Sequence, residues 1–374
     1  MKTNKGNLIA VVMIVLAVNL ACAGLGVPAT PTAVPTQTSI PTKIPTKTSA
    51  PVVPPAPPVS ESKINLATTI QDHASGTFSF YPPVGWTVEG GDYDVYITEQ
   101  KSGVFFYVSV TNTGYQLDAD TYENFVKSTD DFYYASFDGY VLDDYSSSNA
   151  KDVILIDKSY EFEGRTQFVR SVYNQFGATS YTFEILGPES AIKGNSAYLT
   201  VFEDFIGSLE VDPDAANGLP IYGPTWNFVG PNEAMSIDVP LGWAYQFDDH
   251  ETYSDALIET LQSPDLAALI ENVSVVDGNS YTMGNAGQMA LFLLNDRYSS
   301  GSNDIRVSDI KTLNDGSEFW TWRSVKGGFS GVTNFELRDG GRQILLLSFI
   351  SDNDFLDLYQ PLFDRVLSTY TIPK

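Results

Sequence analysis

The chain has 374 residues, with 21 lysines and arginines against 46 aspartates and glutamates, so its formal charge is −25 at pH 7. Such a balance argues against nucleic acid as a partner, because Lys and Arg at the phosphates supply most of that affinity, and it disfavours attraction to an anionic lipid surface. A single cysteine excludes an internal disulfide and any metal or iron–sulfur site built on several cysteines. The length favours two domains.

The first 22 residues have the pattern of a secretory signal peptide. Lys2 and Lys5 precede an apolar run from Leu8 to Val18, and small residues follow it. A basic start, a short apolar run and a small-residue cleavage site are typical of export signals. The run is shorter than the roughly 20 residues that cross a bilayer. We therefore predict a signal peptide over residues 1–22.

The one cysteine of the chain, Cys22, stands directly after Leu20 and Ala21. This placement resembles the signal of a bacterial lipoprotein, in which the cysteine becomes the lipidated N-terminus. A lone cysteine in an exported chain otherwise has little purpose. We expect Cys22 to carry lipid and to anchor the protein in the cell membrane, facing the extracytoplasmic side. Ordinary secretion and an uncleaved anchor are the alternatives.

Residues 23–63 are rich in proline and threonine and nearly free of large apolar side chains. Such a segment buries too little surface to offset its ordering entropy, so we predict a disordered linker. Proline biases it toward polyproline II at about 3.1 Å per residue, which gives a reach on the order of 100 Å. We interpret it as a spacer between membrane and globular part, with O-linked sugar as a further expectation. A ligand for a proline-binding domain is the alternative.

The globular part contains an internal repeat. The pattern apolar-Ser-apolar followed by Pro-x-Gly-Trp occurs at Ser79 and Trp86 and again at Ser236 and Trp243, with one offset: 236 − 79 = 157 and 243 − 86 = 157. This period indicates duplicated domains, because solenoid repeats are about 20–50 residues long. We predict a first domain over 64–211, a breaker-rich linker over 212–224 and a second domain over 225–374. Fragments 64–212 and 220–374 are expected to unfold separately.

In the first domain, apolar alternation and turn residues predict strands. They are expected at 78–81, 94–98, 104–111, 139–145, 152–162, 166–175 and 178–186. A helix is expected between the third and fourth strands, with Asp120 and Glu123 as a capping box before Phe125. The spacing of the apolar residues from Tyr198 to Leu209 predicts a closing helix.

The second domain shows the same order of elements. Its strands are expected at 235–239, 256–261, 270–276, 305–311, 317–326, 330–338 and 342–350. Helices are expected near 283–295 and from Phe355 to Leu367, and hairpin turns at Asn314-Asp315-Gly316 and at 338–341. Trp86 and Trp243 are expected to be buried, each with its indole N–H bonded. Strand runs with separate helices favour the α+β class.

This order of elements resembles the PsbP-like superfamily. The resemblance rests on the opening strand into Pro-x-Gly-Trp, the antiparallel meander and the closing helix, and it covers 66–211 and 225–373. It implies two tandem PsbP-like domains, each a central antiparallel sheet packed between helices. The superfamily includes a subunit of the photosystem II oxygen-evolving complex, a Ran-binding nuclear-import factor and many bacterial exported proteins. It therefore implies a fold and no single activity.

Residue types for catalysis are scarce. The only histidines are His73 and His250, Cys22 precedes the domains, and no Gly-x-Ser-x-Gly, Walker or Gly-x-Gly-x-x-Gly motif is present. A Ser-His-Asp triad is disfavoured for this reason. A pair of carboxylates for glycoside chemistry cannot be chosen among so many acids without distances. We predict no catalytic residue, and a hydrolase is the weakest of the alternatives.

Acidic clusters are the main polar feature of the domains. They are Asp118 with Asp120, Asp130-Asp131, Asp143-Asp144, Asp248-Asp249-His250-Glu251, and Asp352 with Asp354 and Asp357. Carboxylates suit Ca²⁺, and the last set begins like a calcium loop, but the Gly and the Glu that such a loop needs are missing. We interpret the clusters as solvated surface and predict no metal ligand or cofactor. Calcium is the alternative.

Aromatic and acidic residues alternate over 131–140. Exposed rings of this kind stack on a sugar or contact a partner, whereas buried rings belong to a helix end and a strand start. We favour the core.

The sequence thus predicts an acidic, membrane-anchored extracytoplasmic protein for binding or assembly, without catalytic activity of its own. Its expected partners are the membrane, through the lipid anchor, and a protein or another component of the cell envelope. The chief alternative is a small-molecule or carbohydrate binder that uses a cleft between the domains.

Overall fold

The computed structural model describes residues 63–230, 235–248, 256–276, 280–314 and 316–371. The chain divides into two units, Met1–Lys63 and Ile64–Lys374, and the second unit contains the two large sheets and their helices. The predicted signal peptide, Cys22 and all of the predicted linker except Lys63 lie outside the described residues.

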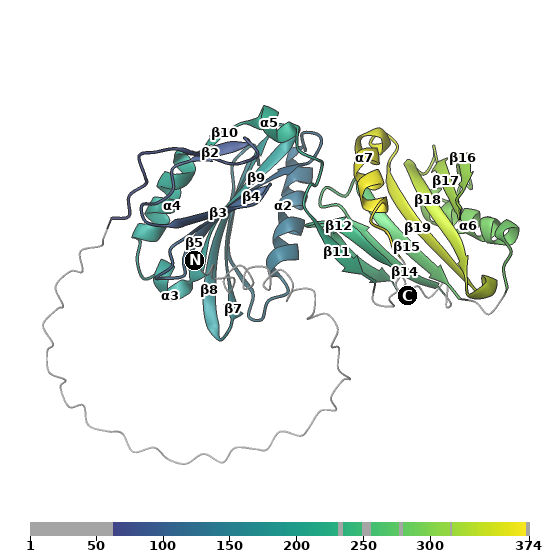
Figure 1. The fold of residues 1–374 in the computed structure, drawn as a ribbon, viewed down its shortest axis with the longest axis horizontal. Coiled ribbons are helices and arrows are strands. Elements are labelled where there is room, and N and C mark those ends of the chain that lie inside the picture. The colour runs from purple at the N-terminus through teal and green to yellow at the C-terminus, as the bar shows by residue number, and fades with distance from the viewer. Residues whose placement is uncertain (1–62, 231–234, 249–255, 277–279, 315, 372–374) are drawn as a thin grey trace, which may run out of the picture. The chain divides into compact units, whose positions relative to one another are not determined.

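The first half of this unit is built around a seven-stranded antiparallel sheet (Figure 1). Its strand order is β3-β4-β5-β9-β8-β7-β6. In chain order the strands are β3 (Thr87–Gly90), β4 (Asp94–Thr98), β5 (Phe105–Asn112), β6 (Val141–Ser147), β7 (Val153–Phe162), β8 (Arg165–Phe176) and β9 (Thr179–Pro188). A smaller sheet joins β1 (Gln71–Asp72), β2 (Phe78–Phe80) and β10 (Glu210–Val211) in the order β1-β2-β10.

Helices pack on both faces of this sheet. Helix α2 (Ala119–Tyr134) covers one face, where its apolar side chains meet those of β7 and β8. Helix α4 (Ala197–Gly207) and strand β2 cover the other face, in a core that includes Phe106, Ile185 and Phe202. Two short helices, α3 (Glu189–Ile192) and α5 (Pro213–Asn217), complete this half.

The second half repeats the same topology. Its seven-stranded antiparallel sheet has the order β13-β14-β15-β19-β18-β17-β16. The strands are β13 (Ala244–Asp248), β14 (Ala256–Gln262), β15 (Ala268–Val275), β16 (Arg306–Thr312), β17 (Glu318–Arg323), β18 (Phe329–Arg338) and β19 (Gln343–Asp352). Strands β11 (Thr225–Val229) and β12 (Ser236–Pro240) form a separate pair. A 3₁₀ turn, η2 (Asp339–Gly341), connects β18 to β19.

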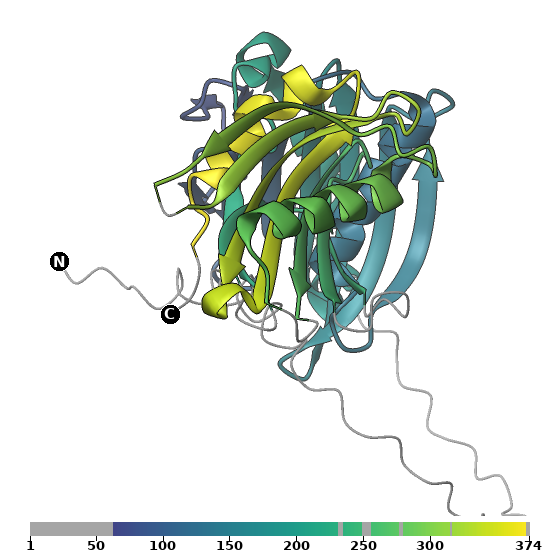
Figure 2. The ribbon, with the colours of Figure 1, turned by 90° about the vertical axis from the view of Figure 1, so that its right-hand side faces the viewer.

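Helix α6 (Met283–Tyr298) lies across one face of the second sheet (Figure 2), and α7 (Leu356–Leu367) packs against β19 and β12 on the other. Each sheet is thus packed between helices, and α2 and α6 occupy equivalent places in the chain. The predicted α+β class and the repeat of elements are confirmed by these two sheets.

The structure corrects and extends the prediction at particular places. The capping box at Asp120 and Glu123 is wrong, because Asp118 has the extended backbone of an N-cap and accepts from the N–H groups of Asp120 and Thr121. The sequence pattern does not predict strands β3, β11 and β13. The turn glycines Gly85 and Gly242 do adopt positive φ, at 85° and 81°.

Both sheets end in an exposed edge strand that carries an irregularity at the same place. The register of β6 on β7 shifts between Leu142 and Asp144, and that of β16 on β17 shifts between Val307 and Asp309. Bulges and charged residues on an edge strand hinder its pairing with another chain.

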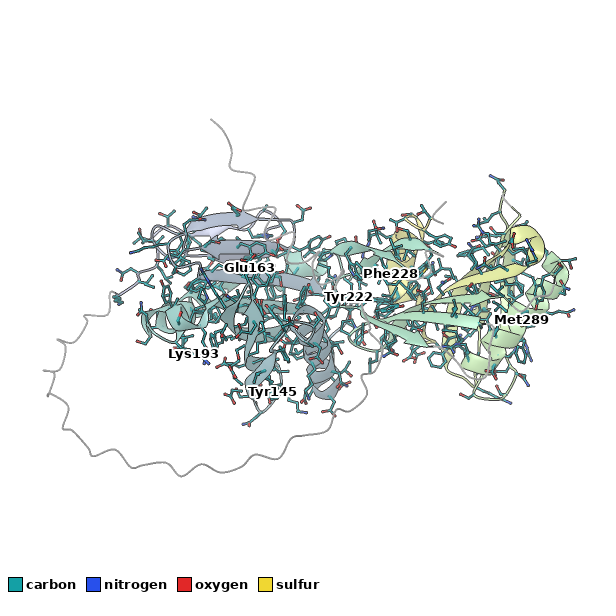
Figure 3. All side chains as sticks on the ribbon, turned by 90° about the horizontal axis from the view of Figure 1, so that it is seen from below. Tyr145, Glu163, Lys193, Tyr222, Phe228 and Met289 are labelled. Atoms are coloured by element: carbon teal, nitrogen blue, oxygen red, sulfur yellow. The ribbon has the colours of Figure 1, made fainter. Side chains whose placement is uncertain are left out.

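The two halves share one hydrophobic core. It combines side chains of α2 with those of α7 and of the second sheet, and Tyr222 lies between them (Figure 3). The ring of Tyr222 meets Trp243 edge to face at 5.9 Å and stacks on Tyr359 at 6.4 Å. Because this core crosses from one half to the other, fragments 64–212 and 220–374 would each expose part of it. Separate unfolding of the two fragments is therefore not expected from the structure.

The two repeated tryptophans differ in burial. Trp243 is fully buried in the shared core, but its Nε1 has no hydrogen-bond partner, so the predicted indole bond is wrong there. Trp86 is half-buried, and its ring lies 4.7 Å from that of Phe106. Trp243 belongs to the cluster of aromatic and aliphatic side chains that forms this core.

We predict that Trp243→Ala destabilises the protein by about 3–5 kcal/mol, the usual cost of removing a large buried side chain. Trp86→Ala should cost clearly less, because part of its ring is already in water. Denaturant unfolding of both variants measures the difference, with Trp243→Phe as a control that keeps a ring. Equal losses for the two alanine variants would contradict the difference in burial.

Candidate functional site

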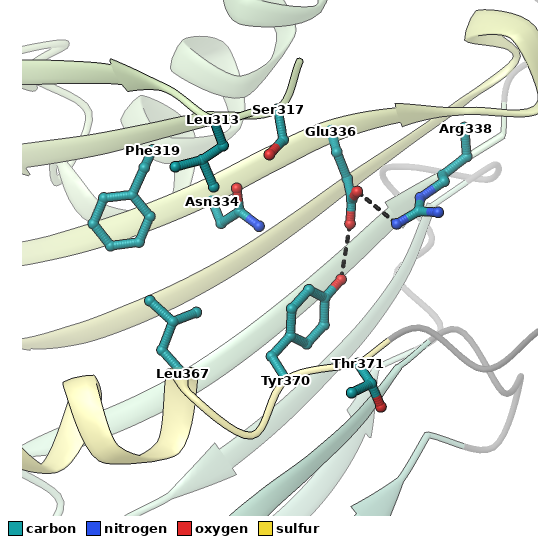
Figure 4. A pocket seen from close by; sticks show the side chains of 9 residues that line it. All are labelled: Leu313, Ser317, Phe319, Asn334, Glu336, Arg338, Leu367, Tyr370 and Thr371. Carbon is teal, nitrogen blue, oxygen red and sulfur yellow. Dashed lines mark hydrogen bonds and ion pairs between the residues drawn. The ribbon is translucent and has the colours of Figure 1, made fainter. Parts of the chain in front are cut away.

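A pocket of about 320 Å³ lies in the second half, between β17–β18 and the end of α7 (Figure 4). Sites for small ligands usually have about 300–1,000 Å³, so this pocket is at the small end of that range. Its lining residues are Leu313, Ser317, Phe319, Asn334, Glu336, Arg338, Leu367, Tyr370 and Thr371.

Strand geometry places the polar floor of this pocket. Asn334, Glu336 and Arg338 alternate along β18, so their side chains point to the same face of the sheet. Phe319 contributes from β17, and Leu367 and Tyr370 contribute from the last turn of α7 and the residues after it. Phe319 lies directly opposite Asn334 in the β17–β18 pairing, so the sheet side of the pocket is both apolar and polar, and Leu367 and Tyr370 line it from the helix side.

Glu336 is held at both carboxylate oxygens. Arg338 donates from Nη2 to Oε2 at 2.6 Å, and the Tyr370 hydroxyl donates to Oε1 at 2.9 Å (Figure 4). Glu336 is only 7% exposed, so the two donors replace the water that would otherwise solvate its carboxylate. The carboxylate therefore ties the end of α7 to the sheet rather than standing free in the pocket.

Asn334 has an unsatisfied polar atom in this pocket. The residue is 8% exposed, and its Oδ1 is buried without a hydrogen-bond partner. In Figure 4 its Oδ1 is directed toward Leu313 and Ser317, and its amide nitrogen lies on the side of Tyr370. A buried acceptor without a donor costs roughly 1–3 kcal/mol. Because the oxygen itself is buried, a ligand in the pocket would reach it only after the side chains around it move.

A second cluster of polar side chains lies under α2 in the first half. Lys158 on β7 is fully buried and pairs with Asp130 of α2. It also donates to Ser171 Oγ at 2.8 Å, and Ser171 donates to Glu184 at 2.5 Å. The Lys158 ammonium lies 3.8 Å from the centre of the Tyr134 ring. One cation is thus surrounded by two carboxylates and an aromatic face.

Burial controls protonation in this cluster. It raises the pKa of Glu184 above its usual value, and the positive charge of Lys158 opposes that rise. It also raises the pKa of the Tyr134 and Tyr173 hydroxyls well above 10, so both stay protonated and act as donors. Tyr134 donates to Glu184 at 2.7 Å, and Tyr173 donates to Asp130 at 3.1 Å. The carboxylates of Asp130 and Glu184 therefore each accept a hydrogen bond from a tyrosine hydroxyl.

The second sheet has a tryptophan where the first has Lys158. Lys158 lies opposite Val169 in the β7–β8 ladder, and Trp322 lies opposite Gly331 in the equivalent β17–β18 ladder. A Cβ on Gly331 would lie 2.7 Å from the Trp322 ring, so only glycine leaves room for it. The ammonium of one repeat is thus replaced by a large apolar ring in the other.

The hydrogen-bonded pair beside this position is also equivalent in the two sheets. Ser171 lies opposite Glu184, and Thr333 lies opposite Ser348. The Trp322 indole donates to Thr333 at 2.9 Å, and Thr333 bonds to Ser348 at 2.9 Å. The second sheet keeps the hydrogen-bonded chain but carries no charge in it.

The one histidine that the structure describes, His73, belongs to the core. His73 is buried, stacks on Phe78 at 4.4 Å, and its ring nitrogens contact Ser75 Oγ at 2.7 Å and the Asp94 carbonyl at 3.0 Å. It is a core histidine with both nitrogens engaged. His250, Asp249 and Glu251 lie outside the described residues.

The acidic clusters mostly lie at the surface. Asp118 caps α2, Asp143 pairs with Lys193 at 3.5 Å, and Asp352, Asp354 and Asp357 are exposed. Asp130 is the exception, since the sequence predicts it at the surface and the structure buries it against Lys158. Within the described ranges, no group of three or more His, Cys, Asp or Glu side chains is arranged to hold a metal ion.

The aromatic segment 131–140 packs as a small satellite core. Tyr134 is buried with Tyr160 and Val169, and Phe137 stacks on Tyr160 at 4.4 Å. The core interpretation is therefore confirmed for the rings at this helix end. No helix in the described part of the chain combines the length and the apolar character that a membrane span needs.

No protein-family model matches the chain, and no curated protein matches its sequence. Among solved structures it is similar to the Ran-binding protein Mog1p of Saccharomyces cerevisiae, with 10% identity over 41% of this chain and 99% of that one and a TM-score of 0.32. It is also similar to the cyanobacterial PsbP, CyanoP, of Synechocystis, with 13% identity, 42% and 96% coverage and a TM-score of 0.33. A Bacteroides thetaiotaomicron protein matches 73% of this chain and 87% of its own, at 10% identity and a TM-score of 0.28. These values do not establish a family, so membership of the PsbP-like superfamily stays a prediction.

We predict that Asp130→Asn destabilises the protein by about 3–5 kcal/mol, because it leaves the buried Lys158 without its closest counter-charge. Asp309→Asn removes the same charge from an exposed pair and should change stability by no more than about 0.5 kcal/mol. Denaturant unfolding of both variants measures the contrast. A small effect at both positions would show that the buried pair contributes little.

Proposed function

We propose that this protein is an extracytoplasmic binding protein, anchored in the cell membrane through lipid on Cys22 and without catalytic activity of its own. The proposal combines the signal-like residues 1–22, the Pro/Thr-rich segment 23–63 and two tandem domains of PsbP-like type, 64–211 and 225–374, joined by 212–224. Its partner is a component of the cell envelope.

The pocket of the second half is the observation that supports binding. It joins an apolar wall to a few polar groups, which is the usual composition of a small-ligand site. Asn334 supplies a buried acceptor without a donor, and such a group favours a ligand that satisfies it. The proposed site therefore lies within the second half, whereas the alternative expected from the sequence is a cleft between the domains.

The same pocket offers little support for chemistry. Its lining residues include neither histidine nor cysteine, and the one carboxylate, Glu336, already accepts from Arg338 and Tyr370. A general base needs a lone pair within reach of the proton that it removes. Glu336 is paired with Arg338 and bonded to Tyr370, and these contacts favour a positioning role over catalysis.

Anchoring is tested with Cys22→Ala. We expect the wild-type protein in the membrane fraction, with a mass increase on the N-terminal peptide that begins at Cys22. The variant should lose this modification and leave the membrane fraction. Retention of the variant in the membrane would contradict a lipid anchor and favour an uncleaved signal.

Binding is tested by ligand-observed NMR of the full chain with a library of small neutral, cationic and anionic fragments. We expect several to bind and Asn334→Leu, which replaces the carboxamide with an apolar side chain of similar size, to abolish their signals. Asn124→Leu, at an exposed position of α2, is the matched control and should leave the signals unchanged. The proposed site is wrong if no fragment signal depends on Asn334.

A further inference from the structure

One lysine of the first half is buried in direct contact with an acid. Among the residues that the structure describes, Lys158 is the only buried lysine, and its Nζ contacts Oδ1 of Asp130 on α2. Neither residue is more than 2% exposed, so the amine and the carboxyl group meet away from bulk water. Two well-oriented groups in contact react at an effective concentration of about 10⁵–10⁸ M. The site therefore favours a reaction between these two side chains.

Burial favours the uncharged forms that can react. An amine attacks through its free lone pair, and a carboxyl group accepts the attack when it is protonated. Burial disfavours charged groups, so one proton that passes from the Lys158 ammonium to Asp130 turns the ion pair into an amine and a carboxylic acid. Burial also raises the pKa of Glu184, the second carboxyl group of the cluster, which favours proton uptake there. The cluster thus contains an acceptor for the second proton that the amine must lose.

A path for this second proton leads from Lys158 to Glu184. Lys158 Nζ lies 3.8 Å from Glu184 Oε1. The Ser171 hydroxyl bridges the two atoms, since it accepts from Nζ at 2.8 Å and donates to Oε1 at 2.5 Å. Tyr134 donates to the other oxygen of Glu184 at 2.7 Å and holds the carboxyl group in place. A hydroxyl that accepts from one group and donates to the next can pass a proton between them.

A tyrosine hydroxyl stands where negative charge would develop. Attack on Cγ of Asp130 moves an electron pair to its Oδ1, and Tyr173 donates to this oxygen at 3.1 Å. Burial raises the pKa of Tyr173 well above 10, so its hydroxyl keeps the proton that it donates. Fixed donors at a developing oxyanion lower the barrier of acyl transfer.

We propose that Lys158 and Asp130 condense into an intramolecular isopeptide bond, with Ser171 and Glu184 as the proton path. After the first proton transfer, the lone pair of Nζ attacks Cγ of Asp130 and the C=O electron pair moves to Oδ1. Glu184 takes the second proton from Nζ through Ser171 and returns it to the Oδ2 hydroxyl, which leaves as water while the Oδ1 carbonyl forms again. One ammonium and one carboxylate thus become one amide and one water, and the ion pair described above is the reactant.

The bond would fasten α2 to β7. It joins residues that are 28 positions apart in the chain, and such a closed loop reduces the conformational freedom of the unfolded state. Helix α2 also carries Phe125, whose ring meets that of Tyr222 at 6.5 Å, so the bond would fix the helix that contacts the second half. The second sheet has Trp322 at the place of Lys158, so one bond is expected in each chain.

Intact mass spectrometry of the denatured full chain tests the bond. Lys158→Met and Asp130→Ala each remove one reactant. We expect the mass of either variant to differ from that of the wild type by the substitution plus one water molecule, because only the wild type has condensed. Modifications elsewhere in the chain cancel in this comparison, and the reading does not require the variants to fold. Mass differences that match the substitutions alone would overturn the proposal.

A surface lysine provides the matched control. Lys193 also contacts two carboxylates, those of Asp143 and Glu189, but its side chain is 46% exposed. Lys193→Met should therefore differ from the wild type by the substitution alone. Fragment spectra of the digested wild type should place the linkage at Lys158 and Asp130, and a linkage at any other pair would overturn the assignment.

The proton path is tested with Glu184→Gln, which keeps the size of the side chain and removes its proton-accepting carboxylate. We expect this variant to fold, as read by circular dichroism, and to retain the water that the wild type has lost. Ser171→Ala interrupts the same path and is read in the same way, so one folded variant suffices. A folded variant that has lost the water as completely as the wild type would overturn the proposed path.

Discussion

The position of Tyr222 constrains the rest of the folded unit. Its ring is buried among Phe125 of α2, Trp243 of the second repeat and Tyr359 of α7. Its backbone is fixed as well, because Arg365 donates to its carbonyl at 3.0 Å and its N–H donates to the Asn112 carbonyl at 2.9 Å. Burial of such an aromatic ring contributes more than most other contacts. The segment that the sequence predicts as a linker is therefore part of the core.

Helix α7 connects the contacts around Tyr222 with the candidate site. The first turn of α7 contributes Tyr359, whose hydroxyl donates to the buried Asp265, and Asp265 also accepts from Tyr115 of the first half at 3.2 Å. The other end of the same helix contributes Leu367 and leads to Tyr370 in the pocket. Since Tyr359 and Leu367 belong to one helix, the contacts that join the halves also help to position one wall of the pocket.

The order of elements could be predicted from the sequence because the long strands bury apolar side chains, on alternate residues in β5 and on both faces in β9 and β19. The prediction of 94–98 coincides with β4, and the long strands agree within one or two residues at most ends. The short strand β3 could not be predicted, since Thr87–Gly90 is polar and mostly exposed. The choice of Asp118 over Asp120 as the cap depends on backbone angles that the sequence pattern does not determine.

The candidate site was harder to predict. Asn334, Glu336 and Arg338 alternate in a strand that the sequence predicts, but Leu313 and Tyr370 join them only through sheet pairing and helix packing. The burial of Lys158 could not be predicted from the sequence either, because a lysine in a strand is normally assigned to the surface. Its counter-charge comes from Asp130, which is 28 residues away and on another element. The alternation of polar residues along β18 was the one signal available.

The difference between Lys158 and Trp322 has a consequence for how a duplicated chain reaches its native pairing. Two sheets of one topology in one chain invite the exchange of equivalent strands during folding. With β7 in the place of β17, Lys158 would lie beside Thr333 and Ser348, and the buried carboxylate next in that layer, Glu271, is already paired with Arg297. With β17 in the place of β7, Trp322 would lie against Val169, where no glycine leaves room for its ring. Each repeat thus disfavours the strand of the other, by an unpaired charge in one exchange and by a steric clash in the other.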